Sequence, residues 1–344
     1  MIPHLRVLTA GMFTTVQDLG RFGYQDIGIP VAGALDPIGL RMANALVGNP
    51  PNAGALEIRI VGPTFRVAAG SVRVALVGTE TPFQIIGAGT RPIVAGRSMR
   101  LRRDQVFQIG AVPDTSCCYL AVEGGFDLPA SFGSLSTYAR GGFGGFEGRP
   151  LREGDQLPLI NDEAPVRPEL ALPDTSCVDT KDPIRVVLGP QENYFTADGI
   201  RTFFESEFTI SPNADRMGLR LDGPTLEHSI GYNIVSDGIA TGAIQVPGTG
   251  KPIILLADHQ TTGGYPKIAT VISADLPRLG RMRPGRKLKF SAVSVADAEQ
   301  IRRTQEQQIR EWLDLLVPVD DAWEPNTATL LSVNLISGVA SIED

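Results

Sequence analysis

LADHQTTGGYPKIA, residues 256–269, is the stretch from which the fold of this 344-residue chain is best read. It joins two apolar runs of β-strand composition, residues 253–257 and 268–272. A Gly-Gly pair and a proline lie between the runs, so the stretch predicts a hairpin-like connection with an ordered polar tip. Gly263 and Gly264 allow the backbone of this tip to approach a ligand closely.

The tip carries more hydrogen-bonding side chains than a turn requires. His259, one of three histidines in the chain, is followed by the amide of Gln260 and the amine of Lys267. An imidazole near an amine can move protons, so we predict a catalytic role for these three residues. A polar surface loop whose glycines only make the turn is the alternative. The tip residues predicted to contact substrate are Thr261, Thr262, Gly263, Gly264 and Tyr265.

Short strands separated by turn signals extend to both sides of this stretch. The 38 glycines and 26 prolines are spread along the chain and mark these turns. Recurring short strands are typical of a β-barrel or a β-sandwich, so we predict a mainly β fold. The predicted strands are residues 56–60, 72–77, 83–86, 98–101, 107–109, 117–122, 156–159 and 184–188.

A few helices interrupt the strands. Asp36 is a good N-cap, Pro37 suits the first helical position and Gly48 suits the C-terminal end, so a helix is predicted between them. Further helices are predicted over residues 192–205 and, with clear amphipathic character, over residues 296–316. For Asp36, the capping role and a catalytic role carry equal weight.

The chain is expected to divide into two β subdomains. Residues 161–183 hold four prolines and many acids and are the predicted linker between a first subdomain, 1–160, and a second, 184–295. Residues 296–344 are predicted to form a C-terminal helix and a loosely held tail. DPIGLRM at residues 36–42 is similar to DRMGLRL at residues 215–221, which indicates a diverged tandem pair of β domains.

Composition argues against several classes of protein. A formal net charge of −7 disfavours a nucleic-acid-binding surface. Three cysteines occur without a metal-binding spacing, and the adjacent Cys117 and Cys118 would point to opposite faces of a strand as buried thiols. No signal peptide and no run of about 20 apolar residues is visible, so we expect a cytoplasmic chain with no membrane segment and no metal site.

Four longer phrases together carry a family resemblance. They are TTVQDLGRFGYQDIGIPVAGALD at residues 14–36, AVEGGFDLPASFGSLSTYARGGFGGFEGRPLREGD at 121–155, NADRMGLRLDGP at 213–224 and SDGIATGAIQVPGTGKPIILLADHQTTGGYPKIA at 236–269. With them the chain resembles the biotin-dependent carboxyltransferase family, also called the allophanate hydrolase subunit 2-like family. Its members include the carboxyltransferase part of urea carboxylase, the KipA antagonist protein and the C subunit of bacterial 5-oxoprolinase. Leu135 departs from the pattern, since members often have GSRST where this chain has GSLST.

The resemblance implies two tandem cyclophilin-like β-barrel subdomains with a substrate cleft between them. It also implies a component of an ATP-dependent 5-oxoprolinase-type complex that opens 5-oxoproline to glutamate. The implied partners are a subunit 1-like protein (KipI-like, similar to the B subunit of 5-oxoprolinase) and a LamB/YcsF-like protein of the A-subunit type. Two alternatives are a biotin-dependent carboxyltransferase acting on urea or a related amide, and a KipA-like protein that sequesters its partner.

Cofactors are expected to be supplied by the rest of such a complex. No biotin-carrier Met-Lys-Met phrase, no ATP-grasp phrase and no P-loop phrase occurs in the sequence. ATP would therefore be used by the complex without an evident site in this chain, and biotin, if used, would be carried by a partner.

Chemistry on an amide of this kind needs a base, donors for a developing oxyanion and a cation for a carboxylate. Arg216 is predicted to bind a carboxylate, oriented by Asp215, and an ion pair that braces the second barrel is the alternative. The glycine run at residues 141–145 marks the opposing part of the first subdomain. The remaining predicted substrate-binding residues are Tyr24, Tyr138, Arg140 and Gln245, of which Gln245 also fits a simple strand end.

Overall fold

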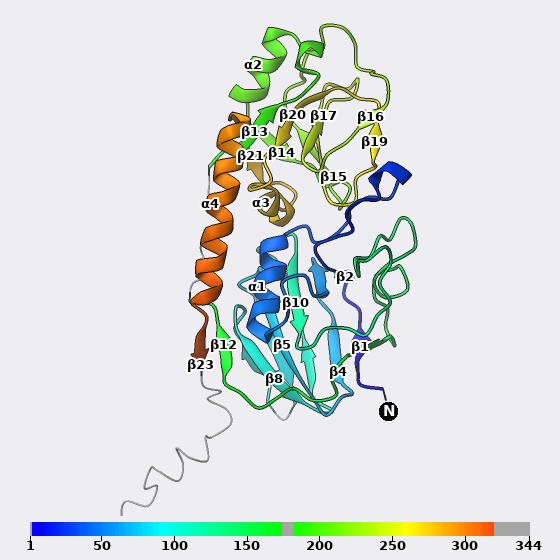
Figure 1. Ribbon diagram of the computed structural model, residues 1–344, viewed down its shortest axis with the longest axis vertical. Coiled ribbons are helices and arrows are strands. Elements are labelled where there is room, and N and C mark those ends of the chain that lie inside the picture. The colour runs from blue at the N-terminus through cyan, green and yellow to red at the C-terminus, as the bar shows by residue number, and fades with distance from the viewer. Residues whose placement is uncertain (1, 88, 174–181, 320–344) are drawn as a thin grey trace, which may run out of the picture.

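Two β units lie one above the other, and a long helix runs along the side of both (Figure 1). The computed structural model describes residues 2–87, 89–173 and 182–319. Short strands make up both units, so the prediction of a mainly β fold is confirmed. The predicted domain boundaries stay predictions, and residues 174–181 of the predicted linker lie outside the described residues.

The first unit consists of two antiparallel sheets. The order of the six-stranded sheet is β11 (Gln156–Pro158), β1 (His4–Thr9), β4 (Thr64–Val67), β9 (Val106–Gln108), β6 (Phe83–Ile86) and β7 (Arg91–Ile93). The order of the five-stranded sheet is β2 (Phe13–Gln17), β3 (Ala55–Arg59), β10 (Cys118–Val122), β5 (Ser71–Val77) and β8 (Ser98–Arg102).

The second unit is built on one eight-stranded sheet. Its order is β21 (Lys287–Leu288), β14 (Phe208–Ile210), β15 (Gly218–Asp222), β18 (Ile253–Leu255), β17 (Ala243–Gln245), β20 (Lys267–Val271), β13 (Ile184–Leu188) and β22 (Phe290–Ala292). Only the β13–β22 pair of this sheet is parallel. Two short pairs lie outside it, β16 (Asp237–Gly238) with β19 (Thr262–Gly263), and β12 (Glu169–Ala171) with β23 (Val317–Val319).

Two large apolar clusters form the core, and β10 separates them. Cys117 lies in a cluster that continues into the second unit, whereas Cys118 lies in the cluster inside the first unit. Successive side chains of a strand point to opposite faces, which explains the division. Both thiols are buried and free, as predicted for this pair.

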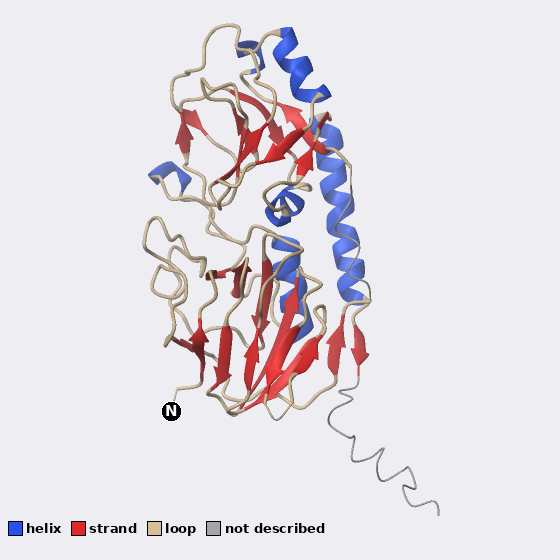
Figure 2. Ribbon diagram, turned by 180° about the vertical axis from the view of Figure 1, so that it is seen from behind, coloured by secondary structure: helices blue, strands red, loops and turns tan. Residues whose placement is uncertain are grey.

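Figure 2 shows the helices in blue, and three of those among the described residues begin at a side chain that caps them. Asp36 caps α1 (Pro37–Val47), Thr196 caps α2 (Ala197–Glu205) and Ser294 caps α4 (Val295–Asp314), while α3 (Leu276–Arg281) lacks a side-chain cap. The predicted helix over residues 192–205 is divided into η2 (Glu192–Tyr194) and α2. The chain is extended at Phe195 and Thr196, because Phe195 enters the core and Thr196 caps the second part. A further short helix, η1 (Gln25–Ile27), precedes α1.

The predicted hairpin around residues 258–267 is wrong. β18 and β20 do not pair with each other, because β17 lies between them and pairs with both. The segment between β18 and β20 therefore crosses the end of β17, and part of it forms β19 against β16. The two sequence neighbours are thus joined through a strand that precedes both in the chain.

The similarity between residues 36–42 and 215–221 does not correspond to a structural repeat. In the first phrase Asp36 caps a helix that Pro37 begins. In the second phrase Asp215 accepts hydrogen bonds from the backbone N–H groups of Met217 and Gly218, and strand β15 follows. A proline at the first helical position favours the helix in only one of the two phrases.

No helix among the described residues is long and apolar enough to span a membrane.

Candidate functional site

Arg216 joins the two units through a buried cluster of charged side chains. Its Nε and Nη2 donate to Asp258 at 2.9 Å each, and its Nη1 lies 2.5 Å from Oε1 of Glu57 on β3. Nη2 also donates to the carbonyl of Gly33 in the first unit. Arg216, Asp258 and Glu57 are all buried. The hydrogen-bond donors of this guanidinium are therefore used by groups of the protein. This favours the alternative in which Arg216 forms a bracing ion pair, and the ion pairs connect the two units instead of lying within the second one.

The polar cluster continues from Glu57 to the start of α1. The hydroxyl of Tyr119 donates to Glu57 at 2.6 Å and accepts from the backbone N–H of Asp36 at 2.8 Å. Oδ1 of Asp36 accepts from the N–H groups of Ile38 and Gly39, and Oδ2 lies 3.4 Å from Nη1 of Arg281. Complete burial raises the pKa of Asp36, and the Arg281 charge opposes this rise. Asp36 is therefore a buried cap within the polar cluster.

His259 follows Asp258 directly and is completely buried. Its Nδ1 lies 2.6 Å from the carbonyl of Gln260, so this nitrogen carries the proton, and Nε2 lies 3.1 Å from Oγ1 of Thr241. Burial lowers the pKa of His259, while the Gln260 carbonyl and the Asp258 charge oppose that effect. The imidazole is thus held neutral, with Nε2 as a proton acceptor toward the Thr241 hydroxyl.

Lys267 begins β20 and is paired with an acid. Its Nζ lies 2.5 Å from Oδ2 of Asp237 and 3.0 Å from the carbonyl of Gly238. The hydrogen bond from Lys267 is the largest cause that lowers the pKa of Asp237. The Lys267 side chain is almost completely buried, whereas that of Asp237 is 53% exposed. The carboxylate of Asp237 therefore lies between the buried ammonium and the solvent. Gln191 accepts from the backbone N–H of Lys267 at 3.2 Å.

Two glutamine amides converge on Gly263. A Cβ atom at Gly263 would lie 2.6 Å from Nε2 of Gln245 and would displace that amide, whereas Nε2 of Gln260 would lie at 3.5 Å, an ordinary contact distance. Among the described residues, Nε2 of Gln245 and Oε1 of Gln260 are buried without a hydrogen-bond partner. Buried polar atoms normally have partners, which makes this pair a candidate contact for an amide-like ligand.

The first unit contributes a segment of serines and glycines held by Asp18. The carboxylate of Asp18 accepts from the hydroxyls of Ser134 and Ser136 and from the N–H of Leu135. Arg21 is buried, donates to the carbonyl of Ser136 and lies over the ring of Phe143, 4.9 Å from its centroid. The charges of Asp258 and Arg216 act on Arg21, which connects this segment to the Arg216 cluster.

Arg140 lies at the exposed edge where the two units meet. Its Nη2 lies 2.9 Å from Oδ2 of Asp215, and both side chains are about half exposed. Asp215 was expected to orient Arg216, but Asp258 and Glu57 do this and Asp215 contacts Arg140 instead. Asp258 follows strand β18 and reaches Arg216 from the same unit, which leaves Asp215 free to turn outward.

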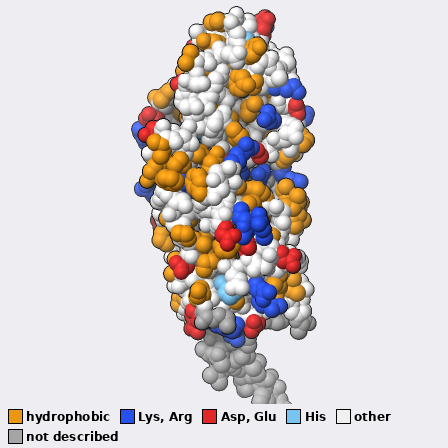
Figure 3. Space-filling view, turned by 90° about the vertical axis from the view of Figure 1, so that its right-hand side faces the viewer, with side chains coloured by type: hydrophobic (Ala, Val, Ile, Leu, Met, Phe, Trp, Pro, Cys, Tyr) orange, Lys and Arg blue, Asp and Glu red, His pale blue; other side chains and the backbone are white. Residues whose placement is uncertain are grey.

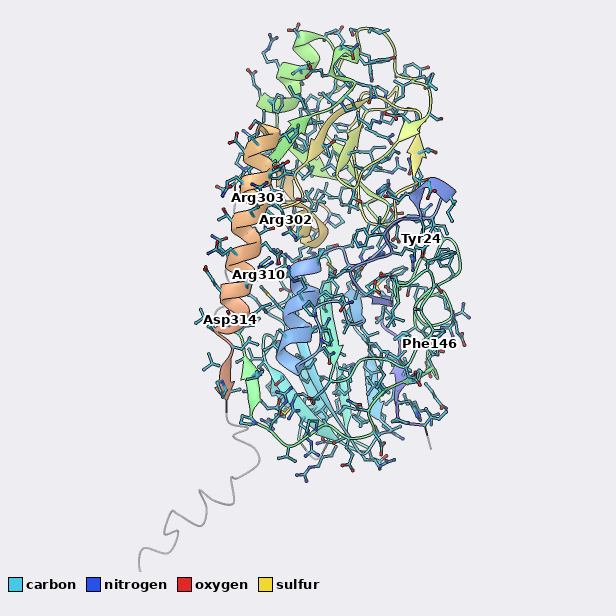
Figure 4. The ribbon with its side chains drawn as sticks, in the orientation of Figure 1. Tyr24, Phe146, Arg302, Arg303, Arg310 and Asp314 are labelled. Carbon is cyan, nitrogen blue, oxygen red and sulfur yellow. The ribbon has the colours of Figure 1, made fainter. Side chains whose placement is uncertain are left out.

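Aromatic rings surround this exposed edge. Tyr24, which Figure 4 labels at the start of η1, lies 5.1 Å from Phe132. Phe143 packs against both Phe132 and Tyr138. Leu135, the residue that departs from the family pattern, packs against the apolar core of the first unit. The tip residues Thr261 and Tyr265 are partly or largely exposed beside β19, which contains Thr262 and Gly263. Gly264 accepts a hydrogen bond from Ile234 through its carbonyl.

Several residues of the site were missed by sequence reasoning. Glu57 carried a usable signal, since a carboxylate within a buried apolar strand requires a partner. Arg21, between a glycine and a phenylalanine, carried a weaker one. Asp237, Gln191 and Thr241 gave none, because their partners are distant in sequence. The described residues contain no group of three or more His, Cys, Asp or Glu side chains that could hold a metal ion.

Comparisons with known proteins give a family and several relatives for this chain. Residues 27–292 match the family model of the carboxyltransferase domain, subdomain A and B. The chain is 38% identical to the C subunit of 5-oxoprolinase from Haemophilus influenzae, over 87% of this chain and 96% of that protein. It is 36% identical to the C subunit of 5-oxoprolinase from Escherichia coli, over 89% of this chain and 97% of that protein.

Larger proteins contain a similar part. Urea amidolyase of Lachancea kluyveri is 32% identical over 88% of this chain, which spans only 18% of that protein. The crystal structure of K. lactis urea amidolyase superposes with a TM-score of 0.81 and 31% identity, covering 91% of this chain and 20% of that one. These matches define a carboxyltransferase-type β protein. The chain belongs to the carboxyltransferase domain family, subdomains A and B.

Proposed function

We propose that this chain is one component of a 5-oxoprolinase-type complex that uses ATP to open 5-oxoproline to glutamate. The observation that carries the proposal is the 38% identity to the C subunit of a 5-oxoprolinase over 96% of that relative's length. The free buried thiols Cys117 and Cys118 suit a reducing compartment, so we place the complex in the cytoplasm.

The neutral imidazole of His259 is the proposed base. Opening a lactam adds a water oxygen to the carbonyl carbon and breaks the C–N bond, and the leaving nitrogen takes up a proton. Nε2 of His259 faces the partly exposed Thr241 hydroxyl, which can pass the proton of the water to the imidazole and later return it to the nitrogen. Because Nδ1 is fixed on the Gln260 carbonyl, the tautomer needed for this acceptance is already present.

Charge and amide contacts are the proposed binding elements. The ammonium of Lys267 supplies positive charge. A substrate carboxylate can take the place of the exposed Asp237 carboxylate beside this ammonium. Gln245 Nε2 is a donor and Gln260 Oε1 an acceptor, which together match the C=O and N–H of a lactam.

ATP chemistry belongs to the partner subunits in this proposal. The first N–H groups of a helix would bind a phosphate, but in α1, α2 and α4 a cap side chain of the chain itself accepts from them. At α1 the cap is the carboxylate of Asp36, which would repel an anion. These three helix N-termini therefore fit a phosphate poorly, and in this proposal a subunit 1-like protein together with a LamB/YcsF-like protein would supply the nucleotide site.

An exposed apolar rim is the proposed contact surface for the subunit 1-like partner. Figure 3 shows the face that carries η1, β16 and β19, with hydrophobic side chains gathered around its middle. The rim consists of exposed side chains from both units, namely Phe22, Ile27, Phe132, Tyr232, Val235 and Tyr265. Exposed apolar side chains that form a contiguous patch mark interaction sites more often than free surface.

Reconstitution with the partner subunits tests the proposal. His259→Gln and Thr241→Val should each lower ATP-dependent turnover of 5-oxoproline by roughly 10²- to 10⁴-fold, the contribution typical of a positioned acid–base group. His228→Gln is the matched control, because the His228 ring contacts the carbonyl of Val246 and the ring of Phe195, away from the proposed base. Full turnover by both site variants, or turnover by this chain without partners, would contradict the proposal.

Carboxyl transfer to urea or a related amide is the second candidate. The TM-score of 0.81 to K. lactis urea amidolyase favours it. Transfer from a biotin carried by a partner would stop when avidin is added, whereas opening of 5-oxoproline would continue. Addition of avidin to the reconstituted complex therefore separates the two candidates.

A further inference from the structure

The short pair β16–β19 lies apart from the eight-stranded sheet, at the outer edge of the second unit (Figure 1). Around this pair, residues 234–239 run antiparallel to residues 261–264 of the polar tip. The backbone N–H groups of Ile234 and Ile239 donate to carbonyl groups of the tip at 2.9 and 3.0 Å. Residues 234–239 therefore cover one side of the tip.

The same segment binds the ammonium of Lys267. Nζ of Lys267 donates to the Asp237 carboxylate at 2.5 Å and to the Gly238 carbonyl at 3.0 Å. Gln191 supports this arrangement, because its side chain hydrogen-bonds Asp237 and accepts from the backbone N–H of Lys267. The Lys267 side chain is only 5% exposed, and an unpaired buried charge is costly. The segment can therefore leave Lys267 at low cost only when another anion replaces Asp237.

Other attachments of the segment are weak. Ile239 is buried in a small cluster with Ala243 and Leu255, and not in either of the two large clusters. The Val235 side chain is 91% exposed. Segments with few buried apolar contacts and exposed backbone hydrogen bonds open locally at low free energy. Replacement of the ion-pair partner is therefore enough to release residues 234–239.

An unpartnered amide of the candidate site lies next to this segment. A Cβ atom at Gly263 would lie 2.6 Å from Cδ1 of Ile239 and also 2.6 Å from Nε2 of Gln245. The Ile239 side chain is thus beside an amide nitrogen that is buried without a hydrogen-bond partner among the described residues. A ligand that contacts this amide gains access when Ile239 moves.

We propose that residues 234–239 are a lid, and that Asp237 is a built-in competitor which the substrate carboxylate must displace from Lys267. The proposal rests on the proposed function, in which Lys267 binds that carboxylate. No covalent bond changes in this step, because one carboxylate replaces another at the ammonium. A lactam without a carboxylate cannot make the exchange, so the lid also makes the site selective for substrates that carry one.

Binding of 5-oxoproline to the full chain, measured by calorimetry, tests the competition. Asp237→Asn removes the competing charge and keeps the side-chain shape, so binding should become tighter by roughly 5-fold, the factor that corresponds to about 1 kcal/mol for a partly exposed ion pair. 2-Pyrrolidinone, the lactam without the carboxylate, should show no such gain. Asp222→Asn is the matched control, because Asp222 pairs with Lys251 at 2.8 Å and is similarly exposed, at 52%.

Hydrogen exchange at the backbone N–H groups of Ile234 and Ile239 tests the opening of the lid. In the unmodified chain, 5-oxoproline should accelerate exchange at both positions, whereas 2-pyrrolidinone should not. Asp237→Asn should accelerate it without any ligand, and Asp222→Asn should leave it unchanged.

The failures of the lid and of the proposed function are distinguishable. Equal affinity of the unmodified chain and Asp237→Asn for 5-oxoproline, or slower exchange of the two N–H groups when it binds, would overturn the lid alone. Absence of 5-oxoproline binding by both proteins would overturn the carboxylate site at Lys267 and the lid with it. Unchanged turnover by His259→Gln in the reconstituted complex would reveal failure of the proposed base separately.

Discussion

Asp36 illustrates how far one side chain can be interpreted. The sequence indicates an N-cap, and the structure adds complete burial, the Tyr119 contact and the Arg281 charge. All of its observed partners belong to the fold, and Oδ1 is used for capping. A purely structural role of Asp36 explains these contacts.

We expect Asp36→Asn to unfold within a few degrees of the unmodified chain at pH 7, because Asn caps helices as well as Asp. Asp36→Ala should lose about 1 kcal/mol, the usual cost of a lost cap. Thermal unfolding measures both. Asn should also keep the turnover of the reconstituted complex, and loss of turnover at unchanged melting temperature would instead make Asp36 a catalytic carboxylate. Since burial raises the pKa of Asp36, its ionisation costs stability as pH rises through that pKa, and the Asn variant should lack this dependence.

His259 gives a pH prediction of the opposite direction. Burial lowers the pKa of His259 below its ordinary 6.5, so the unfolded chain binds a proton that the folded chain resists. The stability contributed by the neutral imidazole is complete above pH 6.5 and is lost as pH falls from there toward the folded-state pKa. Urea unfolding between pH 5 and 8 should show this loss, and His259→Gln should reduce its slope. An unchanged slope would mean that the folded imidazole binds protons as readily as the unfolded one.

At the scale of elements, the glycines of the run at residues 141–145 differ in how much the conformation of that run depends on them. Gly144 and Gly142 both have positive φ, +73° and +69°. A Cβ at Gly144 would lie 2.0 Å from the carbonyl oxygen of Ser136, whereas a Cβ at Gly142 would meet no atom within 4 Å. Backbone conformation alone therefore cannot distinguish the two positions, but close packing does.

We expect Gly142→Ala to cost about 1–2 kcal/mol, the strain of an L-residue at positive φ. Gly144→Ala should cost clearly more, because the backbone of the segment held by Asp18 must also shift. Chemical unfolding compares the two variants, and hydrogen exchange at Leu135 reports on the segment itself. Equal losses of stability would contradict the close contact.

Elements that depend on local pattern could be predicted from the sequence, whereas their arrangement could not. The strands at residues 83–86 and 184–188 and the capped helix after Asp36 follow from alternation and capping, which neighbouring residues determine. The position of β17 between β18 and β20 depends on pairing with residues farther along the chain, so no local signal revealed it. The same reason hid the partners of Lys267 and His259, since Asp237 and Thr241 lie 30 and 18 positions away.

At the scale of the whole molecule, the two units are held together by pairs of unequal strength. Arg216 binds Asp258 of its own unit and Glu57 of the other, and all three side chains are buried. Arg140 and Asp215 also connect the units, but both are more than half exposed. Exposed ion pairs contribute about 0–1 kcal/mol, whereas removal of one partner from a buried pair costs about 3–5 kcal/mol.

Substitution of these two arginines should therefore have very different effects. Arg216→Met leaves two buried carboxylates uncompensated, so we expect a loss of about 3–5 kcal/mol and unfolding of the two units in separate steps. Arg140→Met should lose at most about 1 kcal/mol and keep a single transition, because water already solvates Asp215. Calorimetry measures both the size of the loss and the number of transitions. A small loss with one transition for Arg216→Met would show that the shared apolar cluster, which includes Tyr119 and Leu256 from opposite units, holds the units together without this ion pair.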